Sequence, residues 1–184
     1  MKGFVLAQLA FGPASAALGD RLLRTGWRLE TVGATRIGVR GWPMRRIDTT
    51  AGPIILIGDA YGDRAPAGEG SPAERVRALL SACWGGFVAV LFDPQERLVG
   101  VVRDPTGAID CVVRRRPDRF IAADDPQALD LAADGGLTPD WKGVAGVLRD
   151  WSTLTSAALL ETTSTLAPGA WMDPDGRQQQ VWRP

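Results

Sequence analysis

Short apolar runs, some continuous and some alternating with polar residues, recur along this chain between glycine, proline and aspartate positions. Such runs are typical of strands joined by tight turns. They predict strands over 3–9, 27–32, 35–39, 45–49, 54–57, 87–92, 98–102, 109–114, 119–122, 170–172 and 178–182. Helical spacing predicts helices over 14–24, 126–133 and within 138–150, and a helical turn over 157–161. Many hairpins with a few helices between them predict an α+β fold with antiparallel sheets.

A further helix has the strongest start signal in the chain, at Ser71-Pro72-Ala73-Glu74. Serine suits the N-cap, proline the first helical position, and glutamate closes a capping box. Such a cap stabilises a helix by about 1 kcal/mol. Apolar side chains then follow on one face up to Cys83, and Gly85-Gly86 is expected to end the helix. The preceding segment 63–71, rich in glycine, alanine and proline, is expected to be a mobile loop.

Composition narrows the class of protein. The 184 residues suit a single domain, and 21 basic residues balance 21 acidic ones. Zero net charge gives no reason to expect nucleic acid or a membrane surface as partner. The basic run Arg114-Arg115-Arg116 fits either a solvated strand end, which we favour, or a phosphate cradle. No apolar run reaches the roughly 18 residues that span a bilayer, and Met1–Phe11 lacks the basic start of a signal peptide, so we expect a cytoplasmic protein.

The numbers of histidine and cysteine residues limit the possible catalytic and metal-binding chemistry. The chain has no histidine, which excludes Ser-His-Asp and Cys-His catalysis and histidine-ligated metals within it. Its two cysteines, Cys83 and Cys111, are far apart and lack metal-ligand spacing. We expect buried thiols and no metal site, and a disulfide between them stays open.

Four stretches carry a family pattern. They are Met1-Lys2-Gly3-Phe4; Ile57-Gly58-Asp59-Ala60-Tyr61-Gly62; the capped helix with Trp84-Gly85-Gly86 and Arg103-Asp104-Pro105-x-Gly107; and Leu166-Ala167-Pro168-Gly169 with Val181-Trp182-Arg183-Pro184. In this order they resemble the N-terminal glutaminase domain, a class II glutamine amidotransferase domain, of the asparagine synthetase family. The resemblance covers nearly the whole chain. It implies an N-terminal nucleophile (Ntn) hydrolase fold, an αββα sandwich of two antiparallel sheets between helix layers.

The same resemblance places a catalytic cysteine at position 2 and an oxyanion-binding asparagine at position 57. This chain has Lys2 and Ile57 there. A protonated ammonium is no nucleophile and an isoleucine side chain has no donor, so we expect no catalytic residues and no glutaminase activity. Asp59 replaces a glutamate that would hold the substrate amine. The vestigial pocket would then contain Gly58, Asp59, Arg103 and Asp104.

Alternative roles stay open for several of these residues. Cys83, Cys111, or Lys2 as a desolvated amine are alternative nucleophiles. Arg103 and Asp104 fit either a substrate pocket or domain face, or, as we favour, a buried pair or turn cap that fixes a strand connection. The seven tryptophans are expected in the core or at an interface.

Among asparagine synthetase relatives with a degenerate first domain, the chain is most similar to lasso-peptide cyclases, through Ile57-Gly58-Asp59-Ala60. Those enzymes adenylate a precursor-peptide carboxylate and close a macrolactam with the peptide's own amine, so they need no ammonia. β-Lactam synthetases follow the same logic. The resemblance implies that residues 1–184 are one glutaminase-like domain without a cofactor. An ATP- and Mg-dependent synthetase domain, in the same or a separate chain, would be its partner, with the precursor peptide and its processing protease as further partners. An amidohydrolase with an unconventional nucleophile and a free-standing interaction module are the alternatives.

Overall fold

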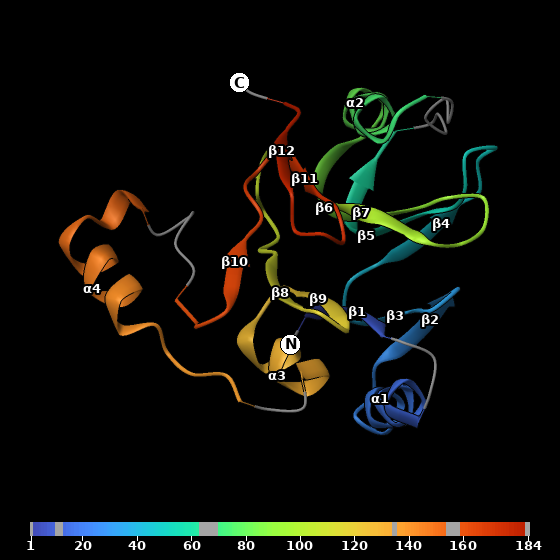
Figure 1. The fold of residues 1–184 in the computed structure, drawn as a ribbon. Coiled ribbons are helices and arrows are strands. Elements are labelled where there is room, and N and C mark those ends of the chain that lie inside the picture. Colours follow the sequence, from blue (N-terminus) through green and yellow to red (C-terminus); the bar gives the residue numbers. More distant parts are fainter. Residues whose placement is uncertain (1, 10–12, 63–69, 134–135, 154–158, 183–184) are drawn as a thin grey trace.

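Two six-stranded antiparallel sheets packed face to face form the body of the protein (Figure 1). The computed structural model describes the chain except residues 1, 10–12, 63–69, 134–135, 154–158 and 183–184. The first sheet contains, in order, β10 (Thr163–Thr165), β8 (Val112–Arg116), β9 (Arg119–Ala123), β1 (Gly3–Leu9), β3 (Thr35–Arg40) and β2 (Arg28–Val32). The second contains β12 (Gln178–Gln180), β11 (Ala170–Met172), β7 (Leu98–Arg103), β6 (Trp84–Phe92), β5 (Ile54–Tyr61) and β4 (Met44–Ile47).

The continuous apolar runs belong to strands that are buried on both faces. In β5, Ile55 and Ile57 face the other sheet, while Ile54 and Leu56 pack against a helix. Successive side chains of a strand point to opposite faces, so a strand between two apolar layers needs apolar residues at every position. The central strands β1 and β6 follow the same rule, which places one core between the sheets and one on each outer face.

Helices cover both outer faces. On the first sheet lie α1 (Pro13–Arg24) and α3 (Pro126–Ala133), and on the second lies α2 (Pro72–Ala82). A fourth helix, α4 (Trp141–Arg149), lies to one side of the sandwich with the short 3-10 helix η1 (Trp151–Thr153) (Figure 1). The predicted α+β class and αββα sandwich are therefore confirmed. Within the described residues no helix is long and apolar enough to cross a membrane.

The predicted cap at Ser71 and most predicted element positions are confirmed. The Ser71 side chain accepts from the Glu74 N–H and the Glu74 carboxylate accepts from the Ser71 N–H, as a capping box requires. The strand predicted over 109–114 instead begins at Val112, because residues 104–111 form a turn. β10 and η1 were not predicted, since neither has a clear apolar pattern. Most of the predicted loop over 63–71 and part of the helical turn predicted over 157–161 lie outside the described residues, and Leu160 forms an isolated bridge with Pro139.

The predicted ends of β5 and α2 were wrong for one reason. β5 continues through Gly58 to Tyr61, and Gly85-Gly86 lies inside β6, paired with Ala60 and Asp59, and does not end the helix. Gly58 has φ +109°, and a Cβ there would lie 2.5 Å from the Gly86 carbonyl oxygen and 2.5 Å from Ile109 Cδ1. These glycines allow two backbones to approach closely within the ladder, so they are not stop signals.

Gly58→Ala is therefore expected to lower the free energy of unfolding by about 3 kcal/mol, through left-handed backbone strain and overpacking together. The matched control is Gly26→Ala, where φ is +80° and nothing lies within 4 Å of the added Cβ. Strain alone should cost about 1 kcal/mol there. Urea unfolding of both variants checks the difference, and equal losses would contradict the close approach at Gly58.

Candidate functional site

The position of the expected nucleophile, at the start of β1, is occupied by a lysine packed on a tryptophan. Lys2 is exposed, and its Nζ lies 4.1 Å from the centroid of the Trp42 ring, a cation–π contact. Trp42 Nε1 donates to Asp124 Oδ2 at 3.1 Å, and the Phe4 N–H donates to Asp124 Oδ1 at 2.9 Å. Burial raises the pKa of Asp124, and these two hydrogen bonds oppose that rise. Lys2, Trp42 and Asp124 thus form one connected set beside the first strand.

The expected oxyanion position is apolar and closed. Ile57 is fully buried between the sheets, and its strand neighbours are Met44 and Val88. The backbone N–H of the next residue, Gly58, already donates to the Pro43 carbonyl at 2.9 Å. Neither the side chain at 57 nor the N–H at 58 offers a free donor to a developing oxyanion.

Two residues of the expected vestigial pocket do meet at a surface pocket of about 190 Å³. Gly58 and the exposed Asp59 line it together with Pro43, Met44, Arg45, Leu56, Ala60 and Tyr61. Its lining does not include Lys2, Ile57, Arg103 or Asp104. The structure therefore splits the expected site into separate places.

Arg103 is buried at the end of β7, and all of its guanidinium nitrogens donate. Nε donates to the Ile109 carbonyl at 2.8 Å, Nη1 to the Leu166 carbonyl at 3.0 Å, and Nη2 to both the Gly107 carbonyl and Asp110 Oδ1. A guanidinium with these partners holds the following turn in place.

Asp104 is fully buried and caps the same turn from its other side. Its Oδ2 accepts from the Phe87 N–H, and its Oδ1 accepts from the Thr106 and Gly107 N–H groups and the Thr106 hydroxyl. Arg103 and Asp104 do not pair with each other, and each bonds the backbone of the turn. Both residues therefore hold the turn that connects β7 to β8, as the favoured expectation requires.

The two thiols lie in different cores, and both are free. Burial raises the pKa of Cys83, and it raises that of Cys111 to about 12. A thiol of that pKa is almost entirely protonated near neutral pH, so it is a poor nucleophile. The described residues also contain no group of three or more cysteine or carboxylate side chains that could hold a metal.

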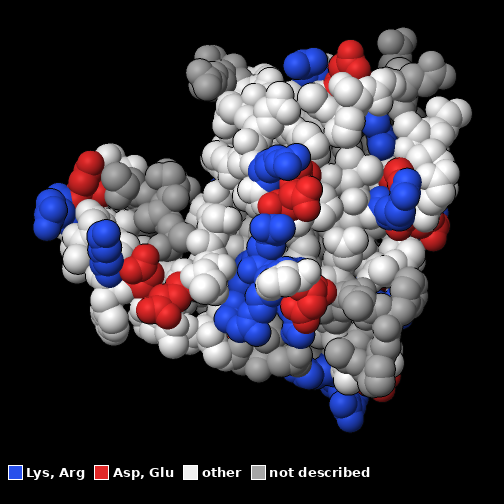
Figure 2. Space-filling model, viewed as in Figure 1, with Lys and Arg blue, Asp and Glu red and all other residues white. Residues whose placement is uncertain are grey.

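The basic run does not converge on one point. Arg114 is buried and donates to the Gly136 carbonyl at 3.2 Å, whereas Arg115 and Arg116 are exposed. Because they are consecutive in β8, their side chains alternate between its two faces. Figure 2 shows basic side chains over β8 and β9 with acidic ones interspersed. A phosphate cradle made by all three arginines is excluded.

Sequence reasoning missed Trp42 and Asp124. They are 82 residues apart, and neither lies in a recognisable motif. They meet because β1 pairs with β3 on one side and with β9 on the other. The only signal was the position of each residue two or three places after a predicted strand.

Asp104→Ala is expected to lower the free energy of unfolding by about 3 kcal/mol, because three buried or partly buried N–H groups lose their acceptor. Asp110→Ala is the matched control: that carboxylate is 73% exposed, and Arg103 keeps three carbonyl acceptors. Its loss should cost less than about 1 kcal/mol. Denaturant unfolding measures both values, and a smaller loss for Asp104→Ala than for Asp110→Ala would refute the capping role.

Both cysteines are expected to resist Ellman's reagent in the native protein at pH 8 and to react once guanidinium chloride unfolds the chain. At that pH the thiolate fraction of Cys111 is on the order of 10⁻⁴. The pKa of its thiol is higher in the folded state, so its contribution to stability is complete below pH 9 and is lost as pH rises towards 12. Rapid labelling of either thiol in the folded protein would contradict this expectation and support a cysteine nucleophile.

Comparison with known proteins identifies the fold. No family model matches the sequence, and no curated protein matches it. The solved structure of the allosteric regulatory enzyme of purine biosynthesis is similar over 100% of this chain and 50% of its own, with a TM-score of 0.56 and 11% sequence identity. The chain thus spans half the length of that protein. At this identity the likeness shows the fold alone, which is the αββα sandwich of two antiparallel sheets between helix layers.

Proposed function

We propose that this chain is a glutaminase-like domain that does not hydrolyse glutamine and supports an ATP-dependent amide-forming synthetase domain. The parent enzyme would be asparagine synthetase-like, most similar to lasso-peptide macrolactam synthetases. One observation carries the proposal: Lys2 packs on Trp42 where a nucleophile would stand, while Ile57 fills the oxyanion position.

The loss of activity follows from the chemistry. Amide hydrolysis through a covalent intermediate needs a nucleophile, a base and donors for the oxyanion. Removing one oxyanion donor alone costs about 3–4 kcal/mol of transition-state stabilisation. Here the Ile57 side chain has no donor, the Gly58 N–H is already bonded to Pro43, and an ammonium replaces the nucleophile. All of these losses hinder the same step, which is the attack on the amide carbonyl and the formation of the oxyanion.

The amide-forming assignment is supported by the motif resemblance. A synthetase that uses the amine of its own peptide substrate needs no ammonia, so its first domain can lose hydrolysis and keep its fold. In this proposal ATP and Mg²⁺ act in the synthetase domain, and the precursor peptide and processing protease are partners of the assembled enzyme.

Exposed aromatic side chains favour an interaction role for this domain. Tyr61 and Trp84 are 52% and 69% exposed, and their ring centroids lie 4.7 Å apart. Trp84 and Trp182 also line a pocket of about 280 Å³ with Leu80 and Pro105. Exposed large aromatic groups of this kind are typical of contact surfaces. The same surface would serve a free-standing interaction module, which is the second candidate.

We expect no ammonia release from glutamine above background, either by this chain or by Lys2→Ala. The protein read from the complete reading frame, or this chain with a separate synthetase polypeptide, should release pyrophosphate from ATP when given a precursor peptide. Ammonia release that disappears in Lys2→Ala, Cys83→Ala or Cys111→Ala would overturn the silent-domain proposal.

The coding sequence separates the two candidates. A Ser-Gly-Gly-x-Asp-Ser pyrophosphate-binding motif downstream of position 184, or in a neighbouring gene, is expected for the synthetase partner. Absence of such a motif from both places would favour the free-standing interaction module.

A further inference from the structure

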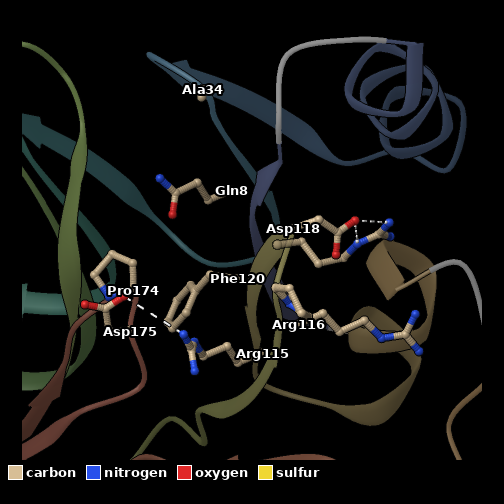
Figure 3. Close-up of a pocket in the computed structure, with 10 residues that line it drawn as sticks. Gln8, Ala34, Arg115, Arg116, Asp118, Phe120, Pro174 and Asp175 are labelled. Atoms are coloured by element: carbon tan, nitrogen blue, oxygen red, sulfur yellow. Dashed lines mark hydrogen bonds and ion pairs between the residues drawn. The ribbon is translucent and has the colours of Figure 1, made fainter.

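Another pocket, of about 480 Å³, opens at the other end of the sandwich (Figure 3). It is lined by Gln8, Ala34, Arg115, Arg116, Pro117, Asp118, Arg119, Phe120, Pro174 and Asp175. Gln8 stands five residues along β1 from Gly3, about 17 Å at the rise of a strand. The pocket is therefore separate from the Lys2–Trp42–Asp124 set, and its volume suits a small molecule.

The side chains at this pocket come from strands and turns of the first sheet and from the turn between β11 and β12. Phe120 belongs to the core between the sheets and is 2% exposed, and Gln8 has the same parity in β1 as the core residues Phe4 and Leu6. Figure 3 shows Gln8, Arg115 and Asp175 around the opening, with Phe120 and Pro174 beside them. The Arg116 side chain extends away from these groups, and Asp118 is bonded to Arg119 at 2.8 Å.

Three polar groups at the opening keep hydrogen-bonding capacity. Arg115 Nη2 and Asp175 Oδ1 are 4.0 Å apart, beyond hydrogen-bond distance, and both side chains are more than half exposed. The Arg115 stem lies over Gly176, where an added Cβ would be 3.1 Å from Arg115 Cδ. Among the described residues, none bonds the Gln8 side-chain amide. One cation, one anion and one amide thus surround a pocket that an edge of the buried Phe120 also lines.

We propose that this pocket binds a free α-amino acid with an apolar side chain. Its carboxylate accepts from Arg115 and from the Gln8 amide, and its ammonium donates to Asp175. Its side chain lies against Phe120 and Pro174.

A simple anion fits the pocket less well. A phosphate held by Arg115 would face the Asp175 carboxylate, while Arg116 points elsewhere and Arg119 is held by Asp118. A zwitterion satisfies both members of the Arg115–Asp175 pair and adds no net charge. Its affinity should therefore depend only weakly on ionic strength, whereas that of an anion should fall as salt screens it.

Isothermal titration of the whole chain with L-leucine tests the proposal. We expect a Kd on the order of 1 mM, as its few non-hydrogen atoms allow. The deaminated analogue 4-methylpentanoate and the decarboxylated analogue 3-methylbutylamine should each bind at least tenfold more weakly. Arg115→Ala and Asp175→Asn should each weaken L-leucine binding about tenfold, and Arg116→Ala, from the same hairpin, should leave it unchanged.

Three outcomes would overturn the amino-acid site. They are no heat of binding at ten times the expected Kd, equal binding of 4-methylpentanoate and L-leucine, or binding of inorganic phosphate in preference to L-leucine. A loss of binding in Arg116→Ala equal to that in Arg115→Ala would also count against it. None of these measurements depends on glutamine hydrolysis or on a synthetase partner, so the site can fail while the proposed function stands.

Discussion

The arrangement of the two sheets depends on the buried guanidinium of Arg103. The chain crosses between the sheets three times: between β3 and β4, between β7 and β8, and between β10 and β11. Arg103 links two of these crossings, because it donates to the Gly107 and Ile109 carbonyls between β7 and β8 and to the Leu166 carbonyl between β10 and β11. Buried charge is stabilising only when it is fully hydrogen-bonded, so both crossings must adopt one conformation around it.

The two crossings also pack directly on each other. A Cβ on Gly107 would lie 2.8 Å from Pro168 Cγ, and the Gly169 N–H donates to the Arg103 and Asp104 carbonyls. These crossings are two of the stretches that resemble glutaminase domains. Their residue types are explained by the architecture, since the turn needs its buried cap and its close approach whether or not any reaction occurs. A motif of this kind is evidence for the fold and gives no information about activity.

The residues at the expected catalytic positions obey a different constraint. Full burial of an Ile57 side chain contributes about 1.5–3 kcal/mol, and it leaves no polar group to satisfy between the sheets. Lys2 on Trp42 similarly adds a cation–π contact at the surface. Functional polar groups commonly lower stability, so their replacement by apolar or self-satisfied groups is compatible with a sandwich at least as stable. Under the proposed function, the fold is kept without glutamine hydrolysis for this reason.

Sequence patterns predicted the strands and the Ser71 cap because local rules decide them: apolar parity for a strand such as β5, and side-chain oxygens for a helix start. The same local rules failed at Gly58 and Gly85, where a distant backbone determines the need for glycine. They were also silent on the bond between Trp42 and Asp124, which two strand pairings create.

The inward face of β1 changes from apolar to polar along the strand. Phe4 and Leu6 continue the core, but Gln8, next in the same parity, is a polar residue at a position that the pattern reserves for an apolar one. Departures from local pattern concentrate where a protein binds something, because elsewhere they only reduce stability. Gln8 lines the same pocket as the loosely paired Arg115 and Asp175, whereas Lys2, before the start of β1, packs on Trp42. The polar groups that a ligand could reach here thus lie at the end of β1 away from the expected glutaminase site.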